Sequence, residues 1–155
     1  MNVASVASYA DQARTRKMAD ANAVGIDDAL ISRLVETFYV QVREDDVLGP
    51  IFAVHVADWT PHLVRMKDFW ASVVMESGRF RGNPMLKHIA IGGLNPSHFD
   101  RWLRLWNETV DEVVPAKAAT LFRAAAQRIA SSLLTGIQIH QGGLAAISPR
   151  AALAS

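Results

Sequence analysis

The chain has no cysteine among its 155 residues. Disulfide bonds, thiolate nucleophiles, iron–sulfur clusters and thiolate-bound metal centres are therefore excluded. A metal ion in this protein would need ligands from His, Asp, Glu, Met or Tyr side chains, or from a cofactor.

An excess of charge of one sign is also missing. Lys and Arg together number 16 and Asp and Glu number 15, which gives a formal net charge of +1. The two signs alternate along the chain, so there is neither a broad basic field nor an acidic tail. We therefore expect no nucleic-acid partner.

Long apolar runs and targeting signals are absent too. No stretch approaches the roughly 18 apolar residues of a membrane span, and we expect no membrane partner. The first ten residues lack the basic start and apolar core of a signal peptide, which favours a cytoplasmic location. Phosphate-binding, dinucleotide-binding, zinc-protease and serine-hydrolase motifs are not found.

What remains is a chain of 50% hydrophobic residues, long enough for one domain with a sizeable core. Residues 1–24 are rich in Ala, Ser and Asn with weak periodicity, and we expect a partly mobile N-terminal extension that carries at most one marginal helix. Residues 25–141 form the predicted domain. Residues 142–155 are an Ala-rich tail that we expect to be mobile.

The apolar spacing of this domain predicts four substantial helices, one very short one and no strand, so the fold class is all-α. Asp27 is predicted to cap the first long helix and Asn95-Pro96 the third, and the second is predicted to start near Asp58 with Pro61 in its first turn. The last long helix is predicted over 116–139 and closed by Gly142-Gly143. The segment Leu48–Phe52 is predicted to be a tight turn, because Gly49 and Pro50 disfavour a helix.

The very short helix, Met85–Ile91, carries His88 in apolar surroundings. A neutral imidazole in such a place suits a haem ligand, although most histidines on apolar helix faces are core residues that bind nothing. The long apolar connection 79–94 must also pack against something, and a flat apolar cofactor would serve.

Two further side chains have an ordinary and a functional interpretation. His62 shares a helix face with Met66 and Phe69, so it lies either at the rim of the core or in a pocket. Tyr39 is either a structural tyrosine or a hydrogen-bond donor in that pocket. Trp102 and Trp106 form a stripe typical of a core. His55 and His62 have no third ligand at regular spacing, which argues against a zinc site.

Taken in order, these residues resemble the group III truncated globins over about residues 30–137. The resemblance rests on the following segments: Phe38-Tyr39, Leu48-Gly49-Pro50-Ile51-Phe52, Trp59-x-x-His62, Phe69-Trp70, Gly82-x-Pro84, Leu86-Lys87-His88, Trp102-Leu103-x-Leu105-Trp106 and Arg128-Ile129-Ala130. The paired-glycine motifs of groups I and II are missing from the first half of the chain.

The resemblance implies a truncated globin fold, a two-over-two helical sandwich around haem b. In it His88 is the proximal ligand of the iron, and Tyr39, His62 and Trp102 line the distal side. The pocket walls are Phe52, Met66, Phe69 and Trp70. Arg79, with Arg65 and Arg81, is a candidate partner of the haem propionates by its location. His62 controls ligand access, donates a hydrogen bond or binds the iron as a sixth ligand.

Three functions are compatible with these residues. The first is reversible binding of O₂, NO or another small diatomic ligand. The second is a redox haem enzyme with nitric oxide dioxygenase or peroxidase-like activity, which requires a reductase as partner. The third is a helical interaction module without cofactor. We expect a monomer or a weak dimer.

Overall fold

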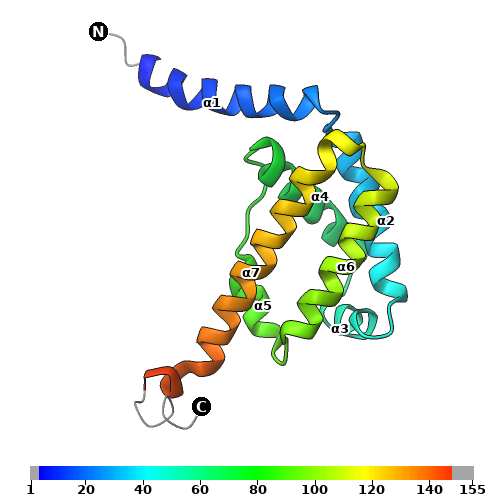
Figure 1. The fold of residues 1–155 in the computed structure, drawn as a ribbon. Coiled ribbons are helices and arrows are strands. Elements are labelled where there is room, and N and C mark those ends of the chain that lie inside the picture. The colour runs from blue at the N-terminus through cyan, green and yellow to red at the C-terminus, as the bar shows by residue number, and fades with distance from the viewer. Residues whose placement is uncertain (1–3, 148–155) are drawn as a thin grey trace.

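The computed structural model describes the backbone of residues 4–147 and the side chains of residues 9–142. Within this part of the chain there are seven helices and no strand, which confirms the predicted all-α class (Figure 1). The helices, in chain order, are α1 (Ala4–Ala23), α2 (Asp28–Glu44), α3 (Leu48–His55), α4 (Trp59–Met75), α5 (Pro84–Ile91), α6 (Pro96–Val113) and α7 (Ala116–Ile147).

The predicted caps Asp27 and Asn95 are present, and Asp58, the predicted start of the second long helix, also caps its helix. The Asp27 carboxylate accepts a hydrogen bond from the Leu30 amide at 2.8 Å, and that of Asp58 accepts one from the Thr60 amide at 3.1 Å. Asn95 accepts from the Ser97 amide at 3.0 Å and opens α6, which has Pro96 as its first residue. Each side chain satisfies a backbone donor that has no partner inside its own helix.

The expected tight turn at Leu48–Phe52 is wrong, because these residues belong to α3. Pro50 lies in the first turn of that helix, where its missing N–H has no intrahelical acceptor to lose. The carboxylate of Asp45 accepts hydrogen bonds from the Val47 and Leu48 amides at 3.1 and 2.9 Å. These bonds start a helix that the Gly-Pro pair alone does not favour.

Within residues 1–24 there is one helix, α1, which occupies most of them. Figure 1 shows α1 projecting from the remaining helices. Its C-terminal end is attached to α4, where Lys17 pairs with Glu76 at 3.1 Å, and Ala21 is buried in the core.

Gly142 and Gly143 do not end the last helix, which continues to Ile147. A helical glycine costs only about 1 kcal/mol relative to alanine, which is too little to stop a long helix by itself. The expectation of a mobile tail over 142–155 otherwise falls on residues 148–155, which lie outside the described part of the chain.

Four helices form the body of the fold as two pairs, α2 with α4 and α6 with α7, and the pairs pack against each other. At the centre the fully buried Trp106 lies between Trp70, whose ring centroid is 4.2 Å away, and Trp102 at 5.9 Å. The Trp106 indole donates to the Phe122 carbonyl oxygen at 3.2 Å. This is the predicted two-over-two arrangement, with the tryptophan stripe in the core. No described helix is long and apolar enough to cross a membrane.

Candidate functional site

The short helix α5 is built to hold His88 at the edge of the core. Asn83 caps it by accepting from the Leu86 amide at 3.1 Å, with Pro84 as its first residue. Gly92 and Gly93 end it with φ angles of 71° and 72°, values that favour glycine. No residue of α5 is buried, although most are apolar. The helix therefore presents apolar side chains that the protein itself does not cover.

The His88 imidazole is oriented by its own helix. Its Nδ1 atom lies 2.6 Å from the carbonyl oxygen of Pro84, one turn earlier. A carbonyl can only accept, so Nδ1 carries the proton and donates. Burial lowers the pKa of His88, outweighing the opposing effect of the Pro84 carbonyl. The ring is then neutral at pH 7 and its Nε2 lone pair is available to a metal.

Four aromatic rings from α2, α3 and α4 form a second group of candidate site residues. We name Tyr39, Phe52, Trp59 and His62 the distal aromatic cluster. The His62 ring centroid lies 5.3 Å from that of Tyr39, 5.4 Å from that of Trp59 and 6.5 Å from that of Phe52. Two predicted distal residues, Tyr39 and His62, are thus in direct contact.

Of the two polar side chains in this contact, that of His62 has a buried atom without a hydrogen-bond partner among the described residues. The Nε2 atom of His62 is buried and unpaired. Burial, followed by the nearby charges of Arg65 and Lys87, lowers the pKa of His62 and favours its neutral form. Burial also raises the pKa of Tyr39 well above its ordinary value, so its hydroxyl stays a donor. Such groups are costly unless something pairs with them.

The remaining predicted wall residues surround the tryptophan stack. Trp70 is 3% exposed and lies deeper than Met66 and Phe69, which pack against the core from partly buried positions. Trp102 stacks on Trp106 and contacts Phe38 at 5.7 Å. Among the described residues no ring contact joins His88 to the distal aromatic cluster, although the charge of Lys87, its neighbour in α5, acts on His62.

The three arginines suggested as propionate partners differ in their surroundings. Arg79 is bound to Asp28 at 2.6 Å and lies 3.7 Å from Asp68, and its hydrogen bond to Asp28 raises its pKa. Arg81 donates only to backbone carbonyls, those of Gly78 and Phe80. Arg65 has no carboxylate partner in the described part of the chain. Arg65 and Arg81 are thus better placed than Arg79 to meet an added anion.

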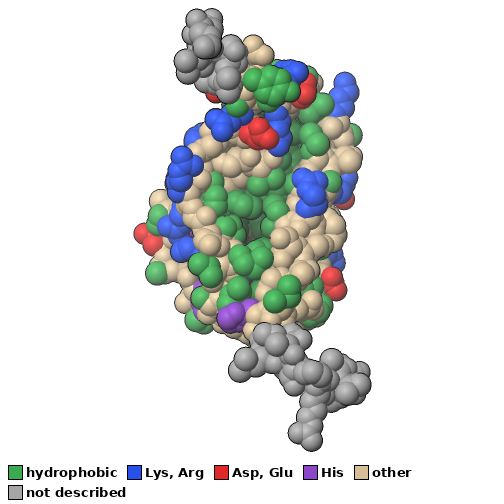
Figure 2. Space-filling view, turned by 90° about the vertical axis from the view of Figure 1, so that its left-hand side faces the viewer, with side chains coloured by type: hydrophobic (Ala, Val, Ile, Leu, Met, Phe, Trp, Pro, Cys, Tyr) green, Lys and Arg blue, Asp and Glu red, His purple; other side chains and the backbone are tan. Residues whose placement is uncertain are grey.

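Figure 2 shows an apolar strip, hollowed in its middle, with Lys and Arg side chains along its borders. This is the left-hand face of Figure 1, where the connection from α4 to α5 lies. An apolar strip bordered by Lys and Arg side chains suits a ligand with an apolar body and an anionic edge.

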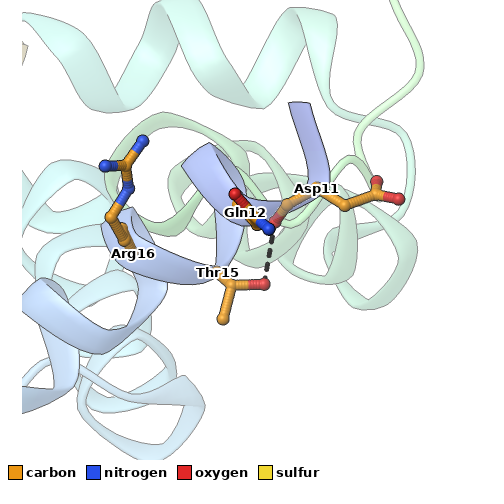
Figure 3. Close-up of a pocket in the computed structure, with 4 residues that line it drawn as sticks. All are labelled: Asp11, Gln12, Thr15 and Arg16. Atoms are coloured by element: carbon orange, nitrogen blue, oxygen red, sulfur yellow. Dashed lines mark hydrogen bonds between the residues drawn. The ribbon is translucent and has the colours of Figure 1, made fainter. Parts of the chain in front are cut away.

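A second depression lies elsewhere, on α1 alone. Asp11, Gln12, Thr15 and Arg16 line it, and the Thr15 hydroxyl donates to the Asp11 carbonyl oxygen at 2.8 Å (Figure 3). It is formed by consecutive turns of one exposed helix and includes none of the predicted site residues. Among the described side chains, those of residues 9–142, no group of three or more His, Asp and Glu residues is placed to hold a metal ion.

Trp59 and Arg43 were missed as functional candidates. The Arg43 guanidinium carbon lies 4.6 Å from the centre of the Trp59 ring. Trp59 lies three residues before His62, and this spacing places two helical side chains on one face. That signal was present in the sequence, whereas the approach of Arg43 depends on how α2 and α4 pack.

Comparison with known proteins agrees with this arrangement. Residues 21–134 match the bacterial-like globin family. The group 3 truncated hemoglobin of Campylobacter jejuni is 34% identical over 110 residues, which cover 68% of this chain and 87% of that protein. The crystal structure of group III truncated hemoglobin from Campylobacter jejuni matches with a TM-score of 0.67 at 32% identity, covering 72% of this chain and 91% of that one. The chain therefore belongs to the bacterial-like globin family, in its group III truncated branch.

Proposed function

We propose that this globin binds haem b with His88 as the proximal ligand and reversibly binds O₂, NO or another small diatomic ligand beside Tyr39, His62 and Trp102. Globins normally bind haem, and the family membership supports that part of the proposal. The observation that carries the residue assignment is the 2.6 Å contact between His88 Nδ1 and the Pro84 carbonyl.

The residues present fit haem. His88 offers a neutral imidazole with Nε2 free, which is the usual proximal ligand of globins. The apolar residues of α5, none of them buried, would cover one face of the flat macrocycle. The unpaired Nε2 of His62 is the kind of orphaned polar atom that a ligand pocket contains. Arg65 and Arg81 would meet the propionates.

When bound and held by His88, haem would supply an iron atom able to bind a diatomic ligand. The chain supplies the surroundings of that ligand. The hydroxyl of Tyr39 and the indole N–H of partly buried Trp102 would donate hydrogen bonds toward it, and little water would compete with Tyr39 because its side chain is buried. Phe52 and the core tryptophans exclude solvent. Trp70 and Met66 define the depth of the pocket.

The test is an absorption spectrum of the purified full-length protein, ferric and ferrous, with O₂ or CO added and then removed. We expect a Soret band that shifts on gas addition and reverts on gas removal. No Soret band after haem is supplied would contradict the proposal. Repeated consumption of NO by O₂-saturated protein with a reductase would assign the redox activity instead of simple binding.

A further inference from the structure

Trp59, the first residue of α4, lies against every other member of the distal aromatic cluster. Its ring centroid is 5.6 Å from that of Tyr39, 5.4 Å from that of His62 and 6.2 Å from that of Phe52. The Phe52 contact is stacked, with an interplanar angle of 26°, and the His62 contact is edge-on at 86°. Both are favourable geometries for aromatic pairs.

Packing alone holds the His62 imidazole. Neither ring nitrogen has a hydrogen-bond partner among the described residues, and Nε2 is buried. The ring is instead in contact with Tyr39, Phe52 and Trp59. Since no hydrogen bond to a described residue selects among the rotamers of His62, its orientation depends on contacts with these three rings.

Trp59 is in turn held from the solvent side. Arg43, an exposed residue in the last turn of α2, lies over the Trp59 ring at 4.6 Å. Exposure to solvent decreases along these three residues. Arg43 is exposed, Trp59 is half-buried, and the Nε2 atom of His62 is buried. A cation over a tryptophan face is an attractive interaction, and here it joins α2 to the start of α4.

We propose that Trp59, held by Arg43, is a positioning residue that keeps the His62 imidazole inside the pocket and thereby slows ligand access. The inference rests on the proposed function for its effect on ligands. Without Trp59 the His62 ring turns toward solvent, and the path that it obstructs is open.

The first measurement does not depend on haem. Nuclear Overhauser contacts between the His62 ring and the rings of Tyr39 and Phe52 are recorded in the full-length protein. We expect these contacts to be lost in Trp59→Leu and retained in Trp59→Phe, which keeps an aromatic ring at that position. The matched control is Arg33→Gln, which removes an exposed arginine from the same helix as Arg43.

The second measurement is the association rate of CO with the ferrous haem-loaded protein. We expect the rate to increase about tenfold for Trp59→Leu and about two- to fivefold for Arg43→Gln. The smaller change corresponds to the usual strength of an exposed cation–π contact. Arg33→Gln should leave the rate unchanged. Because Arg43 acts through Trp59, adding Arg43→Gln to Trp59→Leu should have no further effect.

Retained His62 contacts in a folded Trp59→Leu protein, or a CO association rate that is unchanged or lower, would overturn the inference. If Trp59→Leu does not fold, Arg43→Gln decides, because Arg43 is exposed and has no ring contact with His62. Failure of the proposed function gives a different result, because the unaltered protein then has no Soret band. In that case the nuclear Overhauser contacts of His62 still test whether Trp59 holds the imidazole ring.

Discussion

The Nδ1 atom of His88 donates to the carbonyl oxygen of Pro84 at 2.6 Å. Residues i and i+4 of one helix make this contact, so α5 orients the imidazole without help from another element. Side chains in a helix are tilted toward its N-terminus, so the imidazole of His88 meets the backbone carbonyl one turn earlier. A histidine whose Nδ1 is engaged in this way offers Nε2 to a metal.

Tyr39→Phe should speed release of O₂ from the ferrous protein several-fold. The variant removes a hydroxyl that burial of the side chain keeps protonated, because burial raises the pKa of Tyr39. Stopped-flow displacement of O₂ by CO measures the rate. Since a phenylalanine ring keeps the contacts with Phe52 and Trp59, stability should change little. An unchanged release rate would remove Tyr39 from the proposed donors.

The pKa of His62, lowered from 6.5 mainly by burial and further by Arg65 and Lys87, predicts a pH dependence of stability. Below about pH 6.5 the unfolded chain takes up a proton that folded His62 does not, so the free energy of unfolding falls as the pH falls. Above that pH His62 contributes nothing to the dependence.

Urea unfolding at about pH 7.5 and about pH 5.5 tests this prediction. The unaltered protein should lose more stability between the two pH values than His62→Gln, and His55→Gln, at an exposed position, serves as the control. Equal losses in the unaltered protein and in His62→Gln would show that burial of His62 does not govern its protonation.

Asp45→Asn should destabilise the α2–α3 corner by about 1–3 kcal/mol, the usual cost of weakening hydrogen bonds to a charged group. The Asp45 carboxylate accepts from Arg101 Nε at 2.7 Å as well as from the start of α3. The hydrogen bond from Arg101 is the main cause that lowers its pKa from 3.8 to about 2.

The stabilisation by Asp45 is present above its unfolded pKa near 3.8 and is lost as the pH falls toward about 2. Thermal unfolding at about pH 7 and in that acidic window, with exposed Asp46→Asn as the control, measures both effects. If Asp45→Asn and Asp46→Asn behave alike, Arg101 does not stabilise the corner through Asp45.

Two glycines in close contacts should respond differently to alanine. A Cβ at Gly49 would lie 2.7 Å from the backbone carbonyl oxygen of Arg43, which cannot move without the helix. A Cβ at Gly136 would meet the flexible end of the Met85 side chain. Gly49→Ala should therefore cost about 1–3 kcal/mol and Gly136→Ala clearly less. Denaturant unfolding compares them, and a larger loss for Gly136→Ala would contradict this reasoning.

Much of the fold was predictable because its signals are local. Asp27, Asp58 and Asn95 each accept from amides two or three residues later, and such bonds depend only on neighbouring residues. Helix α3 was not predictable in the same way. A local signal was present, since Asp45 accepts from the Val47 and Leu48 amides, but the Gly-Pro pair opposes it. The interaction that holds the Asp45 carboxylate comes from Arg101, which is 56 residues away.

The same distinction applies to the site. His88, His62 and Tyr39 each had an ordinary explanation, and only the ordered resemblance to a family joined them. The structure adds the contact between Tyr39 and His62, and Arg79 is shown to be engaged by Asp28 and Asp68. Such pairings arise from the packing of separate helices, so no spacing along the chain encodes them.

The role of His88 as the iron ligand is tested most directly by His88→Gly with imidazole added back. Glycine removes the side chain, and free imidazole can occupy the space and supply the missing nitrogen. We predict that the Soret band and the CO-dependent shift of the unaltered protein are lost or displaced in His88→Gly and restored by imidazole. An unchanged spectrum in His88→Gly without imidazole would show that another residue holds the iron.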